Sequence, residues 1–204
     1  ENKLASCLVN PRACHETELL IERAPQPGRI AVVGAGPAGL SFAVTAAERG
    51  HEVVLFESSD QIGGQFNIAR KVPGKEEFNE TLRYFRRQIE LRGVDLRLNT
   101  RVTADALKKD GFDHIVLATG IVPRVPAIEG VGHPKVLSYL DVLRAGREVG
   151  RSVAVVGAGG IGFDVSEFLV HEGESASVVP EKFYAEWGVG TRYAEARGTP
   201  APQG

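Results

Sequence analysis

The sequence predicts an α/β protein built on a parallel sheet with helices on both faces, and three observations carry that prediction. Short apolar runs suited to buried strands alternate along the chain with segments of helical periodicity. Two glycine clusters, within IAVVGAGPAGL and VAVVGAGGIGF, each follow an apolar run and open a helical segment. The chain has 204 residues and is 43% apolar, which is enough to bury a core in one large domain or two modest ones.

The first strand, helix and strand form one βαβ unit. Residues 29–34 (RIAVVG) form a short apolar strand, and residues 37–50 form a helix with Pro37 in its first turn and Gly50 at its end. Residues 52–57 (EVVLFE) form a second buried strand. Residues 1–28, which precede this unit, show little pattern and are interpreted as a lead-in segment.

An amphipathic helix is predicted at residues 76–93. Its apolar side chains recur at helical spacing and are Phe78, Leu82, Phe85 and Ile89. We interpret four basic residues as a solvated helix face, with phosphate recognition left open, and they are Arg83, Arg86, Arg87 and Arg92. Strands are expected at 94–98 and 112–119, with a short helix at 104–109 between them.

The remaining chain repeats the strand-to-helix pattern. Prolines stop regular structure in the loop at 120–130. Residues 135–146 (KVLSYLDVLRAG) predict a strand-to-helix step in which Ser138 caps the helix. Residues 151–173 predict a second strand, glycine turn and helix.

Composition excludes several classes of protein. Lys and Arg total 24 against 26 Asp and Glu, and the net charge of −2 predicts no binding to nucleic acid or to a membrane. No run of 18 apolar residues and no signal pattern occurs, so we expect a cytoplasmic protein. The chain contains no Met and opens ENKLASC, so we expect a piece of a longer polypeptide, truncated at both ends.

The first glycine cluster has the pattern of a dinucleotide site. Gly34 permits a tight turn, Gly36 lets a diphosphate approach the backbone, and Gly39 allows the helix to pack closely on the strand. The free N–H groups at the start of that helix favour an anion. Glu57 follows Gly39 by 18 positions, at the end of the next strand, where its carboxylate can accept both ribose hydroxyls. It would repel a 2′-phosphate, so the site favours FAD or NAD over NADP.

The second cluster, with Gly157, Gly159 and Gly162, is less specific. It has a strand and a helix, but no later strand supplies the residue that separates NADH from NADPH. That choice stays open, as does a glycine turn that binds no ligand.

Two further segments make the chain resemble the two-dinucleotide-binding flavoproteins of the disulfide-reductase type, and they are SSDQIGGQFNIA and HIVLATG. The resemblance implies FAD in the first glycine cluster, Gln65 at the ribityl chain, the backbone of Val102 at the adenine and Gly120 close to the flavin. It also implies NAD(P)H in the second cluster. The positions implied at the two cofactors are Gly34, Ala35, Gly36, Pro37, Ala38, Gly39, Glu57, Gly64, Gln65, Val102, Ala118, Thr119, Gly120, Gly157, Gly159, Gly160 and Gly162.

Longer segments are similar to the bacterial NADPH-dependent 2,4-dienoyl-CoA reductases, namely SCLVNPRACHETE, GKEEFNETLRYFRRQIE, GIVPRVPAIEG, HPKVLSYLDVL and GGIGFD. In that family a barrel like old yellow enzyme carries FMN, and a four-cysteine segment holds a 4Fe-4S cluster. Electrons pass from NADPH through FAD and the cluster to FMN, for a reaction of fatty acid β-oxidation. The implied partners are the barrel domain and the C-terminal segment of the parent polypeptide, and dienoyl-CoA binds only in the parent.

The cysteines and histidines offer no catalytic set within the chain. By spacing alone Cys7 and Cys14 are two free thiols, whereas the resemblance makes Cys7 the last of four cluster ligands, with the other three upstream of Glu1. The proton donors of the family belong to its barrel, so we predict no catalytic residue here and an inactive isolated chain. The histidines are interpreted as solvated or structural, and they are His15, His51, His114, His133 and His171.

The resemblance also implies a domain division. Residues 1–28 would be a linker carrying the end of the iron–sulfur motif, 29–134 the first part of the FAD-binding domain, and 135–204 the incomplete start of the NAD(P)H-binding domain. A later segment of the family completes the FAD domain, so we expect this chain to leave an apolar sheet edge exposed. Two alternatives stay open: a nucleotide-binding module like that of the amine dehydrogenases, and a structural FAD- or ADP-binding domain.

Overall fold

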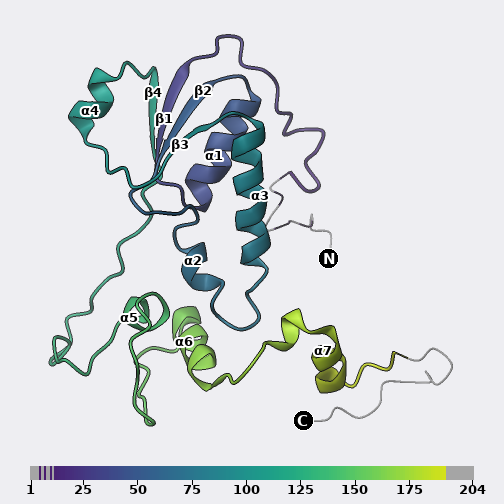
Figure 1. Ribbon diagram of the computed structural model, residues 1–204, viewed down its shortest axis with the longest axis vertical. Coiled ribbons are helices and arrows are strands. Elements are labelled where there is room, and N and C mark those ends of the chain that lie inside the picture. Colours follow the sequence, from purple (N-terminus) through teal and green to yellow (C-terminus); the bar gives the residue numbers. More distant parts are fainter. Residues whose placement is uncertain (1–4, 6, 8–9, 11, 192–204) are drawn as a thin grey trace. The chain divides into compact units, whose positions relative to one another are not determined.

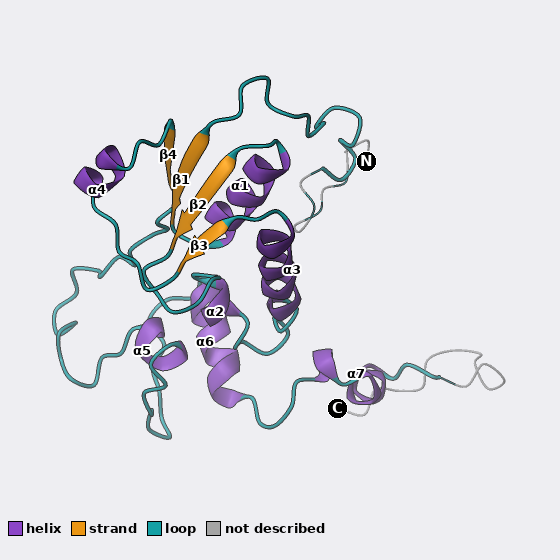
Figure 2. Ribbon diagram, turned by 45° about the horizontal axis from the view of Figure 1, so that its top comes forward, coloured by secondary structure: helices purple, strands orange, loops and turns teal. Residues whose placement is uncertain are grey.

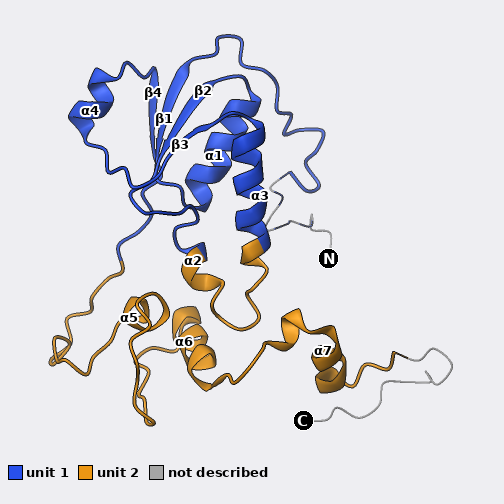
Figure 3. Ribbon diagram, in the orientation of Figure 1, with its two compact units in different colours: residues 1–66, 80–122 blue, residues 67–79, 123–204 orange. Residues whose placement is uncertain are grey.

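A computed structural model describes residues 5, 7, 10 and 12–191 of the chain (Figure 1). Two compact units are present (Figure 3). The first unit takes in Glu1–Phe66 and Glu80–Val122, and the second takes in Asn67–Asn79 and Pro123–Gly204.

The first unit is built on a parallel sheet with the strand order β3-β2-β1-β4 (Figure 2). The strands are β1 (Arg29–Val33), β2 (Glu52–Phe56), β3 (Asp95–Arg97) and β4 (His114–Leu117). Ile30 of β1 lies opposite Val53 on one side and His114 on the other. β1 lies between β2 and β4 and is parallel to both. The glycine turn after β1 and the carboxyl ends of β2 and β4 therefore meet at one edge of the sheet.

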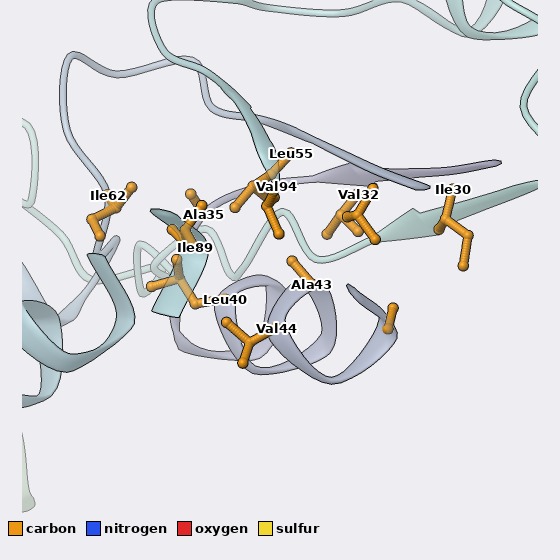
Figure 4. Packing of buried hydrophobic residues seen from close by; sticks show 12 residues of the cluster. Ile30, Val32, Ala35, Leu40, Ala43, Val44, Leu55, Ile62, Ile89 and Val94 are labelled. Atoms are coloured by element: carbon orange, nitrogen blue, oxygen red, sulfur yellow. The ribbon is translucent and has the colours of Figure 1, made fainter. Parts of the chain in front are cut away.

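Helices cover both faces of this sheet. The helices are α1 (Pro37–Glu48), α3 (Phe78–Leu91) and α4 (Ala104–Lys109). Leu40, Ala43 and Val44 of α1 pack against the strands in one buried cluster that also includes Ile89 of α3 (Figure 4). Leu107 of α4 belongs to the other cluster, whose remaining buried members are Ala31, Val54 and Phe56. Alternate residues of β1 and β2 therefore face opposite layers, as the apolar runs require.

The second unit has a smaller core made by short helices. Its elements are α2 (Phe66–Ala69), α5 (Tyr139–Leu143), α6 (Gly160–Val170), a 3-10 turn η1 (Ala176–Val178) and α7 (Pro180–Trp187); Phe66 itself belongs to the first unit. Buried side chains from α2, α5, α6 and the loop after α2 form one cluster, and they are Ile68, Val72, Leu143 and Val165. This cluster fixes where α6 and its glycine turn lie within the unit.

The predicted α/β class with a parallel sheet is confirmed, but several predicted elements differ. The strand expected before the second glycine cluster does not form: residues 153–158 form no helix, strand or turn, and Val153 and Val156 are 47% and 85% exposed. A strand exists only when a neighbour completes its hydrogen bonds, and within the described part of the chain no strand pairs with this segment. The strand expected at 135–137 is also absent, and α2 and α7 were not predicted.

The part of the chain that the structure describes has no helix long and apolar enough to cross a membrane.

Candidate functional site

The first glycine turn, Gly34–Gly39, is shaped by close backbone packing. Gly34 has a φ of +106°, and a Cβ there would lie 2.3 Å from the carbonyl oxygen of Ala118. A Cβ on Gly39 would lie 1.8 Å from the carbonyl oxygen of Gly34. Neither position can carry a side chain while α1, β1 and the end of β4 keep this approach. The first and third glycines of the motif are therefore needed for folding.

Gly36 has a different role, because its own surroundings are open. It is the N-cap of α1, no side chain caps that helix end, and Pro37 occupies the first helical position. A Cβ on Gly36 would meet nothing within 4 Å. The uncapped N–H groups of a 12-residue helix and an open glycine form a cradle that fits the diphosphate of a dinucleotide. This local arrangement fits FAD.

The Gly-Gly loop lies directly against this turn. The N–H of Gly63 donates to the carbonyl oxygen of Ala35 at 2.7 Å. Gly64 has a φ of +51°, and a Cβ there would lie 3.1 Å from the Cα of Gly36. Ala35 is fully buried, whereas Gln65 is exposed. The loop thus packs against the glycine turn through Gly63 and Gly64, and the side chain of Gln65 lies outside the core.

Glu57 lies where β2 ends, with its carboxylate beside the glycine turn. One oxygen, Oε2, accepts from the N–H of Ala35 at 2.8 Å. The other, Oε1, accepts from the N–H and the hydroxyl of Ser59 at 2.9 and 2.8 Å. Each carboxylate oxygen has two lone pairs, so Oε2 retains acceptor capacity, whereas Oε1, which the Ser58 hydroxyl also approaches at 3.3 Å, must exchange a serine donor for a ribose hydroxyl.

Two opposing effects set the pKa of Glu57. Partial burial alone would raise it, because burial penalises the charged form. Hydrogen bonds from the backbone of Ser59 and Ala35, with those from the hydroxyls of Ser59 and Ser58, outweigh burial and lower the pKa below 4.5. The group is therefore an anion at neutral pH, as a ribose acceptor must be. Ser59 was missed in the sequence analysis, although a serine two residues after a strand-terminal acid is typical of such a turn.

The end of β4 completes this edge of the sheet. The N–H of Ala118 donates to the carbonyl oxygen of Val33 at 2.8 Å, which continues the strand pairing up to the glycine turn. Thr119 and Gly120 are exposed, and Gly120 has a φ of +76°. Val102 differs from the other predicted positions, because its half-buried side chain packs on the cluster that includes Leu107. The backbone contact of Val102 with an adenine stays a prediction.

The second glycine turn, Gly157–Gly162, repeats the local geometry of the first. Gly157 has a φ of +120°, and a Cβ on Gly162 would lie 2.1 Å from the carbonyl oxygen of Gly157. Gly159 is the N-cap of α6, without a side-chain cap, and Gly160 begins the helix. A Cβ on Gly157 would meet nothing within 4 Å, whereas one on Gly34 would meet the end of β4. The second turn therefore keeps its conformation without a neighbouring strand packed against it.

Cys7, the predicted iron–sulfur ligand, is not part of a metal-binding group of side chains among the described residues. Cys7 and Cys14 are both exposed and unpaired. Across the residues that the structure describes, no three His, Cys, Asp or Glu side chains lie together as metal ligands would. Cys7 as an iron–sulfur ligand stays a prediction.

Comparison with known proteins identifies the family. The profile of the family described as pyridine nucleotide-disulphide oxidoreductase matches residues 28–182. The chain belongs to this family. It is thus the FAD-binding module of an oxidoreductase flavoprotein, and the family implies FAD and NAD(P) as cofactors.

Several longer proteins are similar to this family member. A metal reductase from Desulforamulus reducens is 39% identical over 178 residues, which cover 84% of this chain and 26% of the relative. The solved 2-naphthoyl-CoA reductase is 38% identical with a TM-score of 0.77, covering 80% of this chain and 25% of that one. Histamine dehydrogenase from Rhizobium sp. 4-9 is 30% identical with a TM-score of 0.56, covering 61% and 19%. The chain spans about a quarter of the length of the curated relatives it matches.

Proposed function

We propose that this chain is the middle part of an NADPH-dependent reductase of the 2,4-dienoyl-CoA type. Its first glycine turn would hold FAD, and its second would hold the nicotinamide dinucleotide. The observation that carries the proposal is the presence, on one chain, of two glycine turns with the same backbone construction. The similarity to a 2-naphthoyl-CoA reductase adds support for a conjugated acyl thioester as substrate.

The residues of the first site would bind and orient FAD, which when bound accepts two electrons from a nicotinamide and returns them one at a time. The N–H groups at the start of α1 would hold its diphosphate, and Glu57 would accept the ribose hydroxyls. Gly64 and Gln65 would lie along the ribityl chain, and Ala118, Thr119 and Gly120 beside the ring.

The rest of the electron path would lie in the parent polypeptide. Cys7 would supply one thiolate of a 4Fe-4S cluster, and the cluster would pass electrons to FMN in a barrel domain, where dienoyl-CoA binds. Residues 1–28 would act as the linker, 29–134 as the first part of the FAD domain and 135–204 as the start of the NADPH domain. A C-terminal segment of the parent would complete the FAD domain.

An amine dehydrogenase is the second candidate. It is favoured by the similarity to histamine dehydrogenase at 30% identity. In that case the second glycine turn would be a structural remnant, and electrons would enter from an amine substrate.

An anaerobic reductive titration of the full-length protein separates the two. The proposal expects NADPH to bleach the flavin absorbance and histamine to leave it unchanged, with turnover on a 2,4-dienoyl-CoA. Gly159→Ala should abolish bleaching by NADPH while dithionite still reduces the flavin, because the new methyl group would occupy the diphosphate cradle. Bleaching by the amine alone would replace the first candidate with the second. Turnover on 2-naphthoyl-CoA but not on a dienoyl-CoA would change the substrate.

A further inference from the structure

An ion pair lies beside the second glycine turn. The Nζ of Lys75 donates to both carboxylate oxygens of Asp164 at 2.6 Å. Both residues belong to the second unit, and their side chains are 40% and 27% exposed. A bidentate contact in a half-buried position is screened less by solvent than the exposed pairs of Glu80 with Arg83 and of Glu90 with Arg87 on α3.

The position of Asp164 on α6 gives this pair a consequence for anion binding. Asp164 follows the N-cap Gly159 by five residues, which places it about 7 Å along the axis from that end of the helix. A free carboxylate at that distance repels a diphosphate bound at the helix N-terminus. Asp164 and Glu167 are the charged residues of α6, so the helix has no Lys or Arg of its own to compensate them.

The compensating charge comes from a segment that is held in place. Val72 is 2% exposed and belongs to the buried cluster with Leu143 and Val165. The Nζ of Lys71 donates to the carbonyl oxygen of Leu143 at 2.7 Å. The N–H of Lys75 itself donates to the carbonyl oxygen of Val72 at 3.0 Å. This anchoring reduces the entropy that Lys75 loses when it pairs with Asp164.

We propose that Lys75 is a positioning residue for the nicotinamide dinucleotide: by neutralising Asp164 it lets the second glycine turn accept a diphosphate. The inference rests on the proposed function, because it takes that turn as the NADPH site. Lys75 acts through Asp164 and touches neither nucleotide nor substrate. Loss of Lys75 and loss of Asp164 should therefore affect NADPH binding differently. Without Lys75 the carboxylate of Asp164 is left unpaired and repels the diphosphate, whereas without Asp164 no repelling anion is present.

The test is the dissociation constant of NADPH, measured by calorimetry on the oxidised full-length protein, which does not depend on turnover. Lys75→Met should raise this constant about three- to tenfold. Asp164→Asn should leave it unchanged or lower it, and the double variant Lys75→Met/Asp164→Asn should return close to the wild-type value. The rate of flavin reduction at saturating NADPH should be the same in all four proteins.

Lys71→Met is the matched control, because it removes a lysine of the same segment whose Nζ donates to the backbone carbonyl of Leu143 and not to a carboxylate. Asp164→Asn should not rescue any defect of Lys71→Met. If Lys75→Met and Asp164→Asn weaken NADPH binding equally and the double variant does not recover, the pair is only a structural tie and the inference is wrong. If Lys75→Met binds like the wild type, the inference is also wrong. A wild type that binds neither NADPH nor NADH overturns the proposed function, and this inference with it.

Discussion

Two glycines of the first turn have different roles: Gly39 allows α1 to pack on β1, and Gly36 leaves room for the diphosphate. Substitution by alanine should separate the two roles. Gly39→Ala would place a methyl group 1.8 Å from the carbonyl oxygen of Gly34, so α1 must move off β1. We expect a loss of about 3 kcal/mol or more in the free energy of unfolding. Gly36→Ala meets no protein atom within 4 Å and has an ordinary φ of −74°. It should cost less than about 1 kcal/mol yet weaken FAD binding at least about tenfold, because the methyl group would face the diphosphate.

Urea unfolding of the apo chain and FAD titration of the folded protein measure these two effects independently. The same unfolding midpoint for both variants would contradict the packing role of Gly39. Wild-type FAD affinity in Gly36→Ala would contradict the diphosphate cradle.

The lowered pKa of Glu57 predicts a pH dependence with a definite sign. A carboxyl group whose pKa is lower in the folded state contributes its full stabilisation above its unfolded-state pKa, near 4.5. That contribution is lost as the pH falls through the lower folded value. Glu57→Gln should therefore lose stability relative to the wild type at pH 7, by about 1–2 kcal/mol for the weakened hydrogen bonds. The difference should shrink as the pH is lowered below 4.5.

The check is the unfolding free energy of both proteins at pH 7 and at a series of pH values below 4.5. FAD binding should weaken at least about tenfold in Glu57→Gln at pH 7. Glu52→Gln, at the exposed start of β2 where the carboxylate pairs with Arg29, is a control for the loss of a surface carboxylate and its contact. A difference between Glu57→Gln and wild type that grows toward low pH would reverse the assigned sign.

At the scale of single elements, what the sequence predicted depends on whether the signal is local. The βαβ unit was predicted within two residues at each end, because apolar runs, Pro37 and Gly50 lie inside the segments they define. Helix α4 has the predicted bounds, since Thr103 caps it and basic residues end it. Helix α7 was not predicted, although proline suits the first helical turn and Gly188, with a φ of 64°, ends the helix.

The strand that does not form before the second glycine turn shows why a local sequence pattern is not enough to predict a strand. Val153, Val155 and Val156 have the right composition, but a strand is a relation between two segments and no local pattern supplies the neighbour. The candidate site shows the same dependence: the glycines and Glu57 were found from their spacing, whereas the hydrogen bond between Ala35 and Glu57 requires the ends of β1 and β2 to meet.

Helix α5 offers a test of local capping, since it has five residues and a capping box. The hydroxyl of Ser138 accepts from the N–H of Asp141 at 3.2 Å, and the carboxylate of Asp141 accepts from the N–H of Ser138 at 2.8 Å. Ser138→Ala should destabilise this helix by about 1 kcal/mol. Hydrogen exchange at Arg144 and Ala145, whose amides bond within the helix, should then quicken about fivefold. Ser138→Thr keeps the cap and should exchange like the wild type. Equal exchange in all three proteins would mean that packing of Leu143 alone holds α5.

At the scale of the whole chain, the two units differ in how much apolar surface they bury. The first unit has a buried cluster on each face of its sheet, and Val32, Leu40 and Leu55 of the larger cluster are fully buried. The second unit has a small cluster and many exposed apolar side chains, among them Phe163 at 67% and Val170 at 74% exposure. β4 also exposes Leu117 at 73%, which agrees with the apolar sheet edge expected from the sequence. Local stability should therefore be unequal along the chain.

Hydrogen exchange of the whole chain, with and without FAD, tests this inequality and the site together. Without ligand, amides of β1 and β2 should exchange at least about a hundredfold more slowly than those of residues 152–158, which have no assigned strand partners. FAD should slow exchange mainly at the first glycine turn, the Gly-Gly loop and the end of β4, because a ligand stabilises the state that binds it. The second glycine turn should respond to NADPH and not to FAD. Uniform exchange in both units would contradict the difference in their cores. Protection by FAD confined to the second glycine turn would mean that the two cofactor sites have been assigned in the wrong order.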